Sequence, residues 1–541
     1  MEISDNEGFE EAGQRLREMV YQGEGDRALA FAEDLHGIDT AVLQLRAWVA
    51  AEVGGERDDL GLLTRAQEMW AEVSNALPGI PQFLYNEGST TEGVFRAVMR
   101  SKGHAAALET AREDLDFARD AYLAVGEDEQ ADKGLRLQAL TNLANSFDTL
   151  GRDLEAIEVY DKALAIDSSF GMALGNKGMA LADVSHLADG HSTAVLSQAV
   201  EALDAALADR EGVIAYGGPN AYETFVTVRS AIQVRDGGAE EHEHREGHVF
   251  GAQGEPWKDP YLEWCRREKL FLHVSLGCLS EDDKHLDPLF FHRLINKIGK
   301  EGELDRVGVL QDAFNAIKQD FIAARYSAWL VSSPQSPIFE QATEVSSRTR
   351  FLDSLSYARW GTRVGMTTQA FVAAANLLDK IACFVHLYLG TGRVKDVYFS
   401  SFWHPRGRRQ EKRMEEAFRT ELELGDTFNR GLLALCDLSC DLERKTDLAE
   451  LINRRHSATH RFLVVHEWDP GEAPSGEFLD RVSWAELSEG LTWQLRTARS
   501  ALIYLVRSLE IREGCLSAKA EAEGKVIPTL PTFDAVSEPP F

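Results

Sequence analysis

Residues 137–170 read LQALTNLANSFDTLGRDLEAIEVYDKALAIDSSF and contain two apolar patterns separated by Gly151. Large and small apolar residues recur at helical spacing in both patterns: Leu140, Leu143, Ala144 and Phe147 in the first, and Ala156, Tyr160 and Ala163 in the second. Residues of alternating size at this spacing interdigitate between packed helices. The stretch therefore predicts a hairpin of two helices, 34 residues long, with its turn at the glycine.

The 34-residue spacing continues beyond this hairpin. Asn142 recurs as Asn176, and Ala144 recurs as Gly178. An earlier unit is expected to begin near Gln82, with its second helix over residues 106–125, and residues 27–77 resemble a degenerate or capping hairpin. The period is that of the tetratricopeptide repeat (TPR), which predicts a TPR-like helical solenoid. An ordinary helical bundle with chance periodicity is the alternative.

The rest of the chain also has a helical pattern, so the predicted fold class is all-α. Helices are expected over residues 309–331, 369–389, 427–442, 448–465 and 485–512, with Asp447 and Glu450 capping the fourth. We expect a TPR-like repeat domain at 1–210, a linker at 211–260, a second helical domain at 261–515 and a disordered proline-containing tail at 516–541. The turn Tyr216–Pro219 and the polar stretch 240–248 mark the linker. His242, His244 and His248 in that stretch can bind a metal ion, but a solvated linker is the favoured interpretation.

The net charge of −31 is unevenly distributed along the 541 residues. Residues 1–250 contain 46 acidic and 20 basic residues, a net charge of −26, and the remaining residues carry −5. The first half should therefore repel RNA, and any RNA contact is expected in the second half. No uninterrupted apolar run approaches the roughly 18 residues of a membrane span, and the amino terminus lacks a signal pattern. These features, and six cysteines without a C-x-x-C pair, predict a cytoplasmic protein with reduced thiols and no membrane partner.

One short motif in the second half has the chemistry of phosphodiester cleavage: Arg455-His456-Ser457-Ala458-Thr459-His460. Arginine makes bidentate contacts to phosphate oxygens, and histidine can move a proton near neutral pH. On an ideal helix Arg455 and His460 lie about 140° apart, whereas His456 and His460 share one face. The pair alone makes a poor pocket, and a charged helix face by chance is the alternative.

The second half resembles the HEPN superfamily, the "higher eukaryotes and prokaryotes nucleotide-binding" domain, in its branch with amino-terminal TPRs. The matching stretches, in order, are Trp264-Cys265, 269–272, 314–321, 324–326, 376–382, 429–433 and 452–465. The last contains the family's R-x4-6-H motif. The resemblance implies a metal-independent endoribonuclease without a cofactor, active in stress or phage defence, that forms a homodimer through the HEPN-like domain.

By this resemblance Arg455 and His460 are the catalytic pair. His456 stands where the family often has asparagine, and Asp379 of the second helix would support a histidine. A salt bridge between Asp379 and Lys380 or a neighbouring arginine is the competing interpretation.

Three further alternatives stay open at this point. His456, His460 and His466 have the spacing of metal ligands, but the stretch lacks the glutamate of an H-E-x-x-H site. The HEPN-like half can instead be a non-catalytic scaffold that dimerises or holds RNA. The basic cluster Arg406, Arg408, Arg409, Lys412 and Arg413 can bind phosphates or form a solvated loop. A protein or peptide is the partner expected for the TPR-like half.

Overall fold

The computed structural model is predominantly helical with a few short strands, so the predicted all-α fold class is confirmed. It describes residues 1–3, 5–236, 256–295, 304–352, 356–391, 395, 397–401, 403, 414–424, 427–443, 458–459, 461–469, 478–525 and 529–530. The chain divides into two compact units. Unit 1 contains residues 1–184, 193–252 and 412–414, and unit 2 contains residues 185–192, 253–411 and 415–541.

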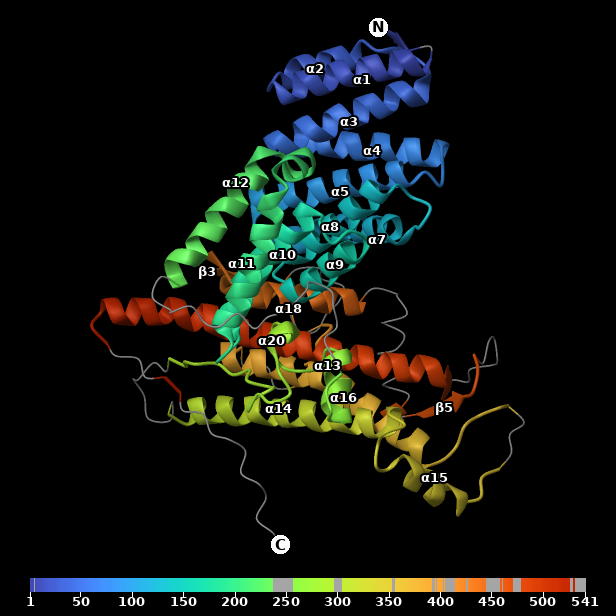
Figure 1. Cartoon of the computed structure of the whole chain (residues 1–541), viewed down its shortest axis with the longest axis vertical. Helices are drawn as coiled ribbons and strands as arrows, with labels where there is room; N and C mark the ends of the chain where they lie inside the picture. Colours follow the sequence, from blue (N-terminus) through green and yellow to red (C-terminus); the bar gives the residue numbers. More distant parts are fainter. Residues whose placement is uncertain are drawn as a thin grey trace. The chain divides into compact units, whose positions relative to one another are not determined.

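Unit 1 is a series of stacked helical hairpins (Figure 1). Its helices are α1 (Asn6–Tyr21), α2 (Gly25–Glu33), α3 (Asp39–Arg57), α4 (Leu60–Ala76), α5 (Pro81–Lys102), α6 (His104–Thr110), α7 (Arg112–Glu127), α8 (Lys133–Thr149), α9 (Asp153–Ile166), α10 (Gly171–Val184), α11 (Ser192–Ala208) and α12 (Arg210–Asp236). Two short parallel strands, β1 (Glu2–Ile3) and β2 (His36–Gly37), lie at its amino-terminal end.

The hairpin predicted from residues 137–170 is formed by α8 and α9. Leu140, Ala144 and Tyr160 are among its buried residues. Gly151 has φ 78° in the turn, a conformation that only glycine adopts without strain. The helix predicted over residues 106–125 is divided instead, because α6 ends at Thr110 and α7 begins at Arg112.

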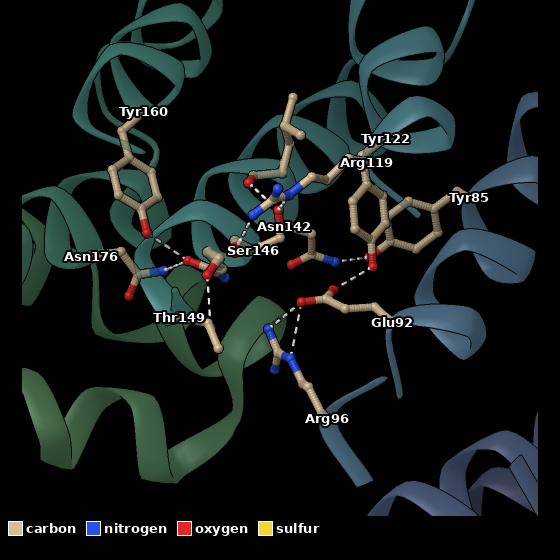
Figure 2. A network of polar contacts seen from close by, with 12 residues as sticks. Tyr85, Glu92, Arg96, Arg119, Tyr122, Asn142, Ser146, Thr149, Tyr160 and Asn176 are labelled. Carbon is tan, nitrogen blue, oxygen red and sulfur yellow. Dashed lines mark hydrogen bonds and ion pairs between the residues drawn. The ribbon is translucent and has the colours of Figure 1, made fainter. Parts of the chain in front are cut away.

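A network of polar side chains connects successive helices of unit 1 (Figure 2). Asn142 of α8 donates to the hydroxyl of Tyr85 on α5 at 2.9 Å. Asn176 of α10 donates at 2.9 Å to the carbonyl oxygen of Asn145 on α8, which also accepts from Tyr160 of α9 at 2.6 Å. The asparagine that recurs after 34 residues therefore occupies a position where neighbouring hairpins are joined by hydrogen bonds.

Glu92 on α5 is 5% exposed and lies within the same network. Its carboxylate accepts from the hydroxyl of Tyr122 at 2.8 Å and from Nε of Arg96 at 2.9 Å. The pKa of Tyr122 lies well above its usual value, mainly because the hydroxyl is buried and secondly because the charge of Glu92 is close. Because a buried carboxylate is costly without partners, the bond from Tyr122 holds α7 against α5, while Arg96 neutralises the carboxylate from within α5.

The predicted linker 211–260 is wrong over its first half. Residues 211–236 belong to α12, which is kinked at Gly218 (φ 73°). The kink confirms the predicted turn, but Pro219 then stands at the start of a second helical segment, where its missing N–H has no cost. His242, His244 and His248 lie outside the described residues.

Unit 2 is built around one long helix, α20 (Trp484–Ala522), which packs against α14 (Leu304–Ser332), α16 (Thr362–Leu389) and α18 (Arg430–Glu443) (Figure 1). Shorter elements complete the unit: η1 (Ser185–Leu187), α13 (Pro260–Arg267), η2 (Leu276–Cys278), α15 (Phe339–Ser347), α17 (Glu416–Leu422), β3 (Glu423–Leu424), β4 (Thr427–Phe428), β5 (Phe462–His466) and β6 (Leu479–Ser483). Within the described residues, α16 alone is long and apolar enough to cross a membrane, and 61% of its most apolar window is buried inside the unit. Such burial is typical of a core helix.

The segment at residues 256–295 is held to the helices by buried charges. Arg325 of α14 is 3% exposed and makes a bidentate pair with Asp287, with N–O distances of 2.9 and 2.7 Å. Its guanidinium also donates to the carbonyl of Leu270 and to the hydroxyl of Tyr261. Burial by itself would raise the pKa of Asp287, but the charge and hydrogen bonds of Arg325 hold it below its usual value.

Helix α20 also forms hydrogen bonds with residues 256–295. Arg499 donates to the carbonyls of Phe271 and His273 at 2.7 and 2.6 Å. The carboxylate of Glu513 accepts from the backbone of Ile295 and from the hydroxyl of Tyr388 on α16. Residues 256–295 are therefore an integral part of unit 2.

Three predicted boundaries in the second half are corrected. Helix α18 begins at Arg430 and not at residue 427, because the side chain of Asn429 accepts from the N–H of Leu432 and caps it. Residues 462–465, predicted as the end of a helix, form strand β5. Helix α20 continues to Ala522, so the predicted disordered tail does not begin at residue 516.

Replacing Arg325 with methionine should unfold the 256–295 segment first. The change leaves the Asp287 carboxylate in a largely buried position without its charged partner, at a cost of about 3–5 kcal/mol. Hydrogen exchange measured by mass spectrometry should show lost protection in peptides from 256–295. Arg348→Met, which removes an exposed pair with Glu344, is the matched control and should change protection little. Equal protection in both variants would contradict the structural role of Arg325.

Adding a methyl group at Gly178 should loosen the packing of α10 on α11. A Cβ atom there would lie 2.8 Å from Cγ of Leu203 and 2.9 Å from the carbonyl oxygen of Ala199, so the helices must move apart. Gly178→Ala should lower the thermal transition of unit 1, whereas Gly55→Ala in α3, with no atom within 4 Å, should be neutral or stabilise by about 0.5–1 kcal/mol. The same transition temperature for both variants would refute the close approach.

Candidate functional site

Arg455, His456 and His460 all lie outside the described residues. So do the predicted cap residues Asp447 and Glu450, and the basic cluster Arg406, Arg408, Arg409, Lys412 and Arg413. The structure describes Ala458 and Thr459, and after the motif it describes residues 461–469 and 478–525. The site is therefore characterised by the elements that directly follow and surround the motif.

A small sheet begins immediately after the motif. Strand β5 pairs with β6 in parallel, from Phe462 opposite Leu479 to His466 opposite Ser483. Residues 356–359 lie antiparallel to β5 along its other side, through an isolated bridge between Ala358 and His466. The sheet is continuous with α20, because Ser483 caps that helix in a capping box with Glu486. The chain leaving the motif is thus anchored to the central helix of unit 2.

His466 is buried, and both of its ring nitrogens have hydrogen-bond partners. Nδ1 lies 2.8 Å from the carbonyl oxygen of Ser356, and Nε2 lies 3.0 Å from a guanidinium nitrogen of Arg481. Because the guanidinium can only donate, Nε2 accepts and Nδ1 carries the hydrogen. The lone pair that a metal ion would need is therefore occupied, which argues against His466 as a metal ligand. Within the described part of the chain, no group of three or more potential metal ligands occurs.

Asp379 lies near the middle of α16 and contacts backbone. Its Oδ1 accepts from the N–H of Phe399 at 2.9 Å, which holds the segment 397–401 against the helix. The competing salt bridge with Lys380 is not formed, since the ammonium group of Lys380 pairs with Asp320 of α14. Asp379 thus has an observed positioning role, and its predicted support of a histidine stays a prediction.

Two arginine side chains lie where the edge of the sheet meets the start of α20. Arg359 and Arg363 both lie over the ring of Trp484, 4.7 and 5.0 Å from its centroid. Arg359 pairs with Glu467 at 2.9 Å, whereas Arg363 donates to the carbonyl of Val331 and has no carboxylate partner among the described residues. Burial and the charge of Arg359 lower the pKa of Arg363 from its usual value. This edge of unit 2 therefore carries positive charge that is only partly neutralised.

Exposed aromatic side chains occupy both ends of the sheet. Phe462 and Phe478 are 67% and 64% exposed and are joined by a backbone hydrogen bond of 3.0 Å. At the opposite end Tyr357 and Trp468, 74% and 64% exposed, contact edge to face with ring centroids 5.3 Å apart. These four residues do not stand out in the sequence when residues 462–465 are predicted as the end of a helix. The adjacent β-branched residues Val464 and Val465 favour a strand locally, but two residues are too few to outweigh the helical pattern, and pairing with β6 decides the outcome.

Comparison with known families gives one match. Residues 303–512 match the family model described as LA2681-like HEPN. A comparison with curated proteins found no match. The matched range contains α14, α16, α18, most of α20, the sheet and the motif at 455–460. It begins after the stretches at 264–265 and 269–272 that were part of the resemblance. The second half of this chain therefore contains a HEPN domain, similar to the LA2681-like HEPN family over residues 303–512.

Proposed function

We propose that this protein is a metal-independent endoribonuclease whose catalytic pair is Arg455 and His460. The observation that carries the proposal is the presence of an R-x4-H motif within the residues that match the HEPN family model. HEPN domains are often ribonucleases, and the residue types are those that phosphodiester cleavage needs. By the same resemblance, the cellular setting is stress or phage defence in the cytoplasm.

The proposed reaction is attack of an RNA 2′-hydroxyl on the adjacent 3′-phosphate. His460 removes the proton of the 2′-hydroxyl as its oxygen bonds to phosphorus. The bond from phosphorus to the 5′-oxygen breaks, and that oxygen takes up a proton, leaving a 2′,3′-cyclic phosphate and a 5′-hydroxyl. Arg455 stabilises the charge that develops on the phosphoryl oxygens. His456, on the same helical face as His460 in an ideal helix, is a second group able to supply a proton.

A dimer of HEPN domains is part of the proposal. One copy of the motif places Arg455 and His460 on different faces of an ideal helix, about 140° apart. Two copies related by a two-fold axis would bring both kinds of side chain into one cleft. The amino-terminal helical unit would recognise a protein or peptide that regulates cleavage, since its negative charge disfavours RNA. A scaffold that binds RNA without cutting it is the competing function.

Single alanine substitutions at Arg455 and His460 should each reduce RNA cleavage by at least about 100-fold, because each removes a group that acts in the transition state. The assay uses the full chain with total RNA in EDTA, and product ends are identified as cyclic phosphates. Arg348→Ala and His285→Ala, two exposed residues of the same types, are the controls. Unchanged activity of His460→Ala, or strict dependence on added divalent metal, would refute the catalytic assignment. Absence of cleavage by the unaltered protein, with RNA still bound, would favour the scaffold.

The active species should be a dimer. Light scattering is expected to give twice the chain mass at concentrations where cleavage is maximal, and activity per chain should fall on dilution as the dimer dissociates. When Arg455→Ala protein is mixed with unaltered protein, the activity per unaltered chain should fall, because mixed dimers have an incomplete cleft. Dilution with buffer at the same dimer concentration would leave that activity unchanged. A monomer with full activity would contradict the composite cleft.

A further inference from the structure

The sheet that follows the motif exposes large aromatic side chains at both of its ends. Its aliphatic residues Val464, Val465 and Val482 are buried, whereas the large exposed side chains are aromatic. We define the aromatic platform as Tyr357, Phe462, Trp468 and Phe478. We propose that this platform binds single-stranded RNA by stacking unpaired bases, with Arg359 and Arg363 contacting the phosphates. The inference deepens the proposed ribonuclease function and rests on it for its biological role.

The backbone presents one of these rings at a conformational cost. Tyr357 has φ 56°, a left-handed conformation that is uncommon for a bulky residue. Two backbone hydrogen bonds to the chain around β5 maintain this conformation. The carbonyl of Tyr357 accepts from the N–H of Glu467, and the N–H of Arg359 donates to the carbonyl of Val465. The result is a ring that is 74% exposed and packed edge to face on Trp468. An aromatic pair held in this way is pre-organised for a base to stack on it.

The position of the platform suits a substrate site. One residue separates His460 from Phe462 in the sequence, and two consecutive Cα–Cα steps span at most about 7 Å. The Phe462 and Phe478 end of the sheet is therefore close to the proposed catalytic histidine by covalent connectivity alone. The five residues of β5 extend about 17 Å to the Tyr357 and Trp468 end, which is long enough for a few stacked or splayed nucleotides.

Charge favours RNA over a second copy of this chain as the occupant. Arg359 and Arg363 share the ring of Trp484, and Arg363 has no carboxylate partner in the described part of the chain. Arg461, next to Phe462, is exposed as well. The two guanidinium groups lie over half-buried rings, Arg363 also over Phe339, at the edge of the same sheet that carries the exposed aromatics. Cations beside exposed aromatic rings are the combination that binds single strands, because the rings stack on the bases and the cations contact the backbone phosphates. Two copies meeting through this surface would bring the arginines of one copy toward the same cations of the other, which opposes the contact, whereas RNA phosphates neutralise them.

The test measures binding separately from cleavage. The probe is a fluorescein-labelled 2′-O-methyl oligouridine 12-mer, which has no free 2′-hydroxyl to attack, titrated into the full chain in EDTA. Trp468→Ala and Phe462→Ala should each weaken binding about 5- to 100-fold, and Trp468→Phe should retain most of it because a ring remains. Tyr21→Ala and Tyr398→Ala remove exposed aromatics elsewhere and are the controls. In a plot of log affinity against log salt concentration, Arg363→Met should make the negative slope shallower by about 0.7, because one phosphate contact is lost.

A second measurement does not depend on variants. A 4-thiouridine 12-mer cross-linked to the unaltered protein should attach to peptides containing Tyr357, Phe462, Trp468 or Phe478. Unchanged affinity in the aromatic variants, or cross-links confined to other peptides, would overturn the platform even if the protein cleaves RNA. Lost dimerisation of the same variants in light scattering, with RNA affinity unchanged, would assign the surface to a contact between copies. Normal platform binding without any cleavage would instead refute the proposed nuclease and leave the platform standing.

Discussion

The burial of α20 is the constraint on which unit 2 depends. A helix of 39 residues that is apolar over much of its circumference must be covered on several sides. α14, α16 and α18 cover part of it, and the segment 256–295 is drawn in by Arg499 and Glu513 on the helix itself. The second anchor of that segment is the Arg325–Asp287 pair on α14. This explains why the compact unit extends beyond residues 303–512, the range that matches the HEPN family.

The same helix determines where the candidate site lies. Strand β6 leads directly into α20 through the Ser483 capping box, and β5 pairs with β6. The motif residues precede β5, so the chain on their carboxyl side is tied to the longest helix of the unit. Rigid support of this kind is what a catalytic group needs, since misplacement by about 1 Å can cost a large factor in rate. His466 contributes to the support and not to the chemistry, because both its ring nitrogens bond to neighbouring groups.

Net charge differs between the two halves of the chain. The first 250 residues carry −26 of the −31 net charge, while unit 2 presents Arg359, Arg363 and exposed aromatics beside the motif. In unit 1 the polar side chains shown in Figure 2 are used to join one hairpin to the next. Asn142 and Asn176 recur with 34-residue spacing, and the structure gives the physical reason: each donates a hydrogen bond to a residue of a neighbouring helix.

The sequence by itself determined the helical hairpins, the glycine turn at 151 and the core helices of the second half, because helical periodicity and glycine conformation are local properties. It also determined the motif that identifies the HEPN resemblance. Only the tertiary structure decided that residues 462–466 form a strand, since strand pairing with residues 479–483 and 356–359 supplies hydrogen bonds that no local pattern reveals. The partners of Asp379 and Arg325 were likewise fixed by tertiary contacts. Asp379 bonds to the backbone 20 residues away and Arg325 to a carboxylate 38 residues away, distances in sequence over which spacing carries no information.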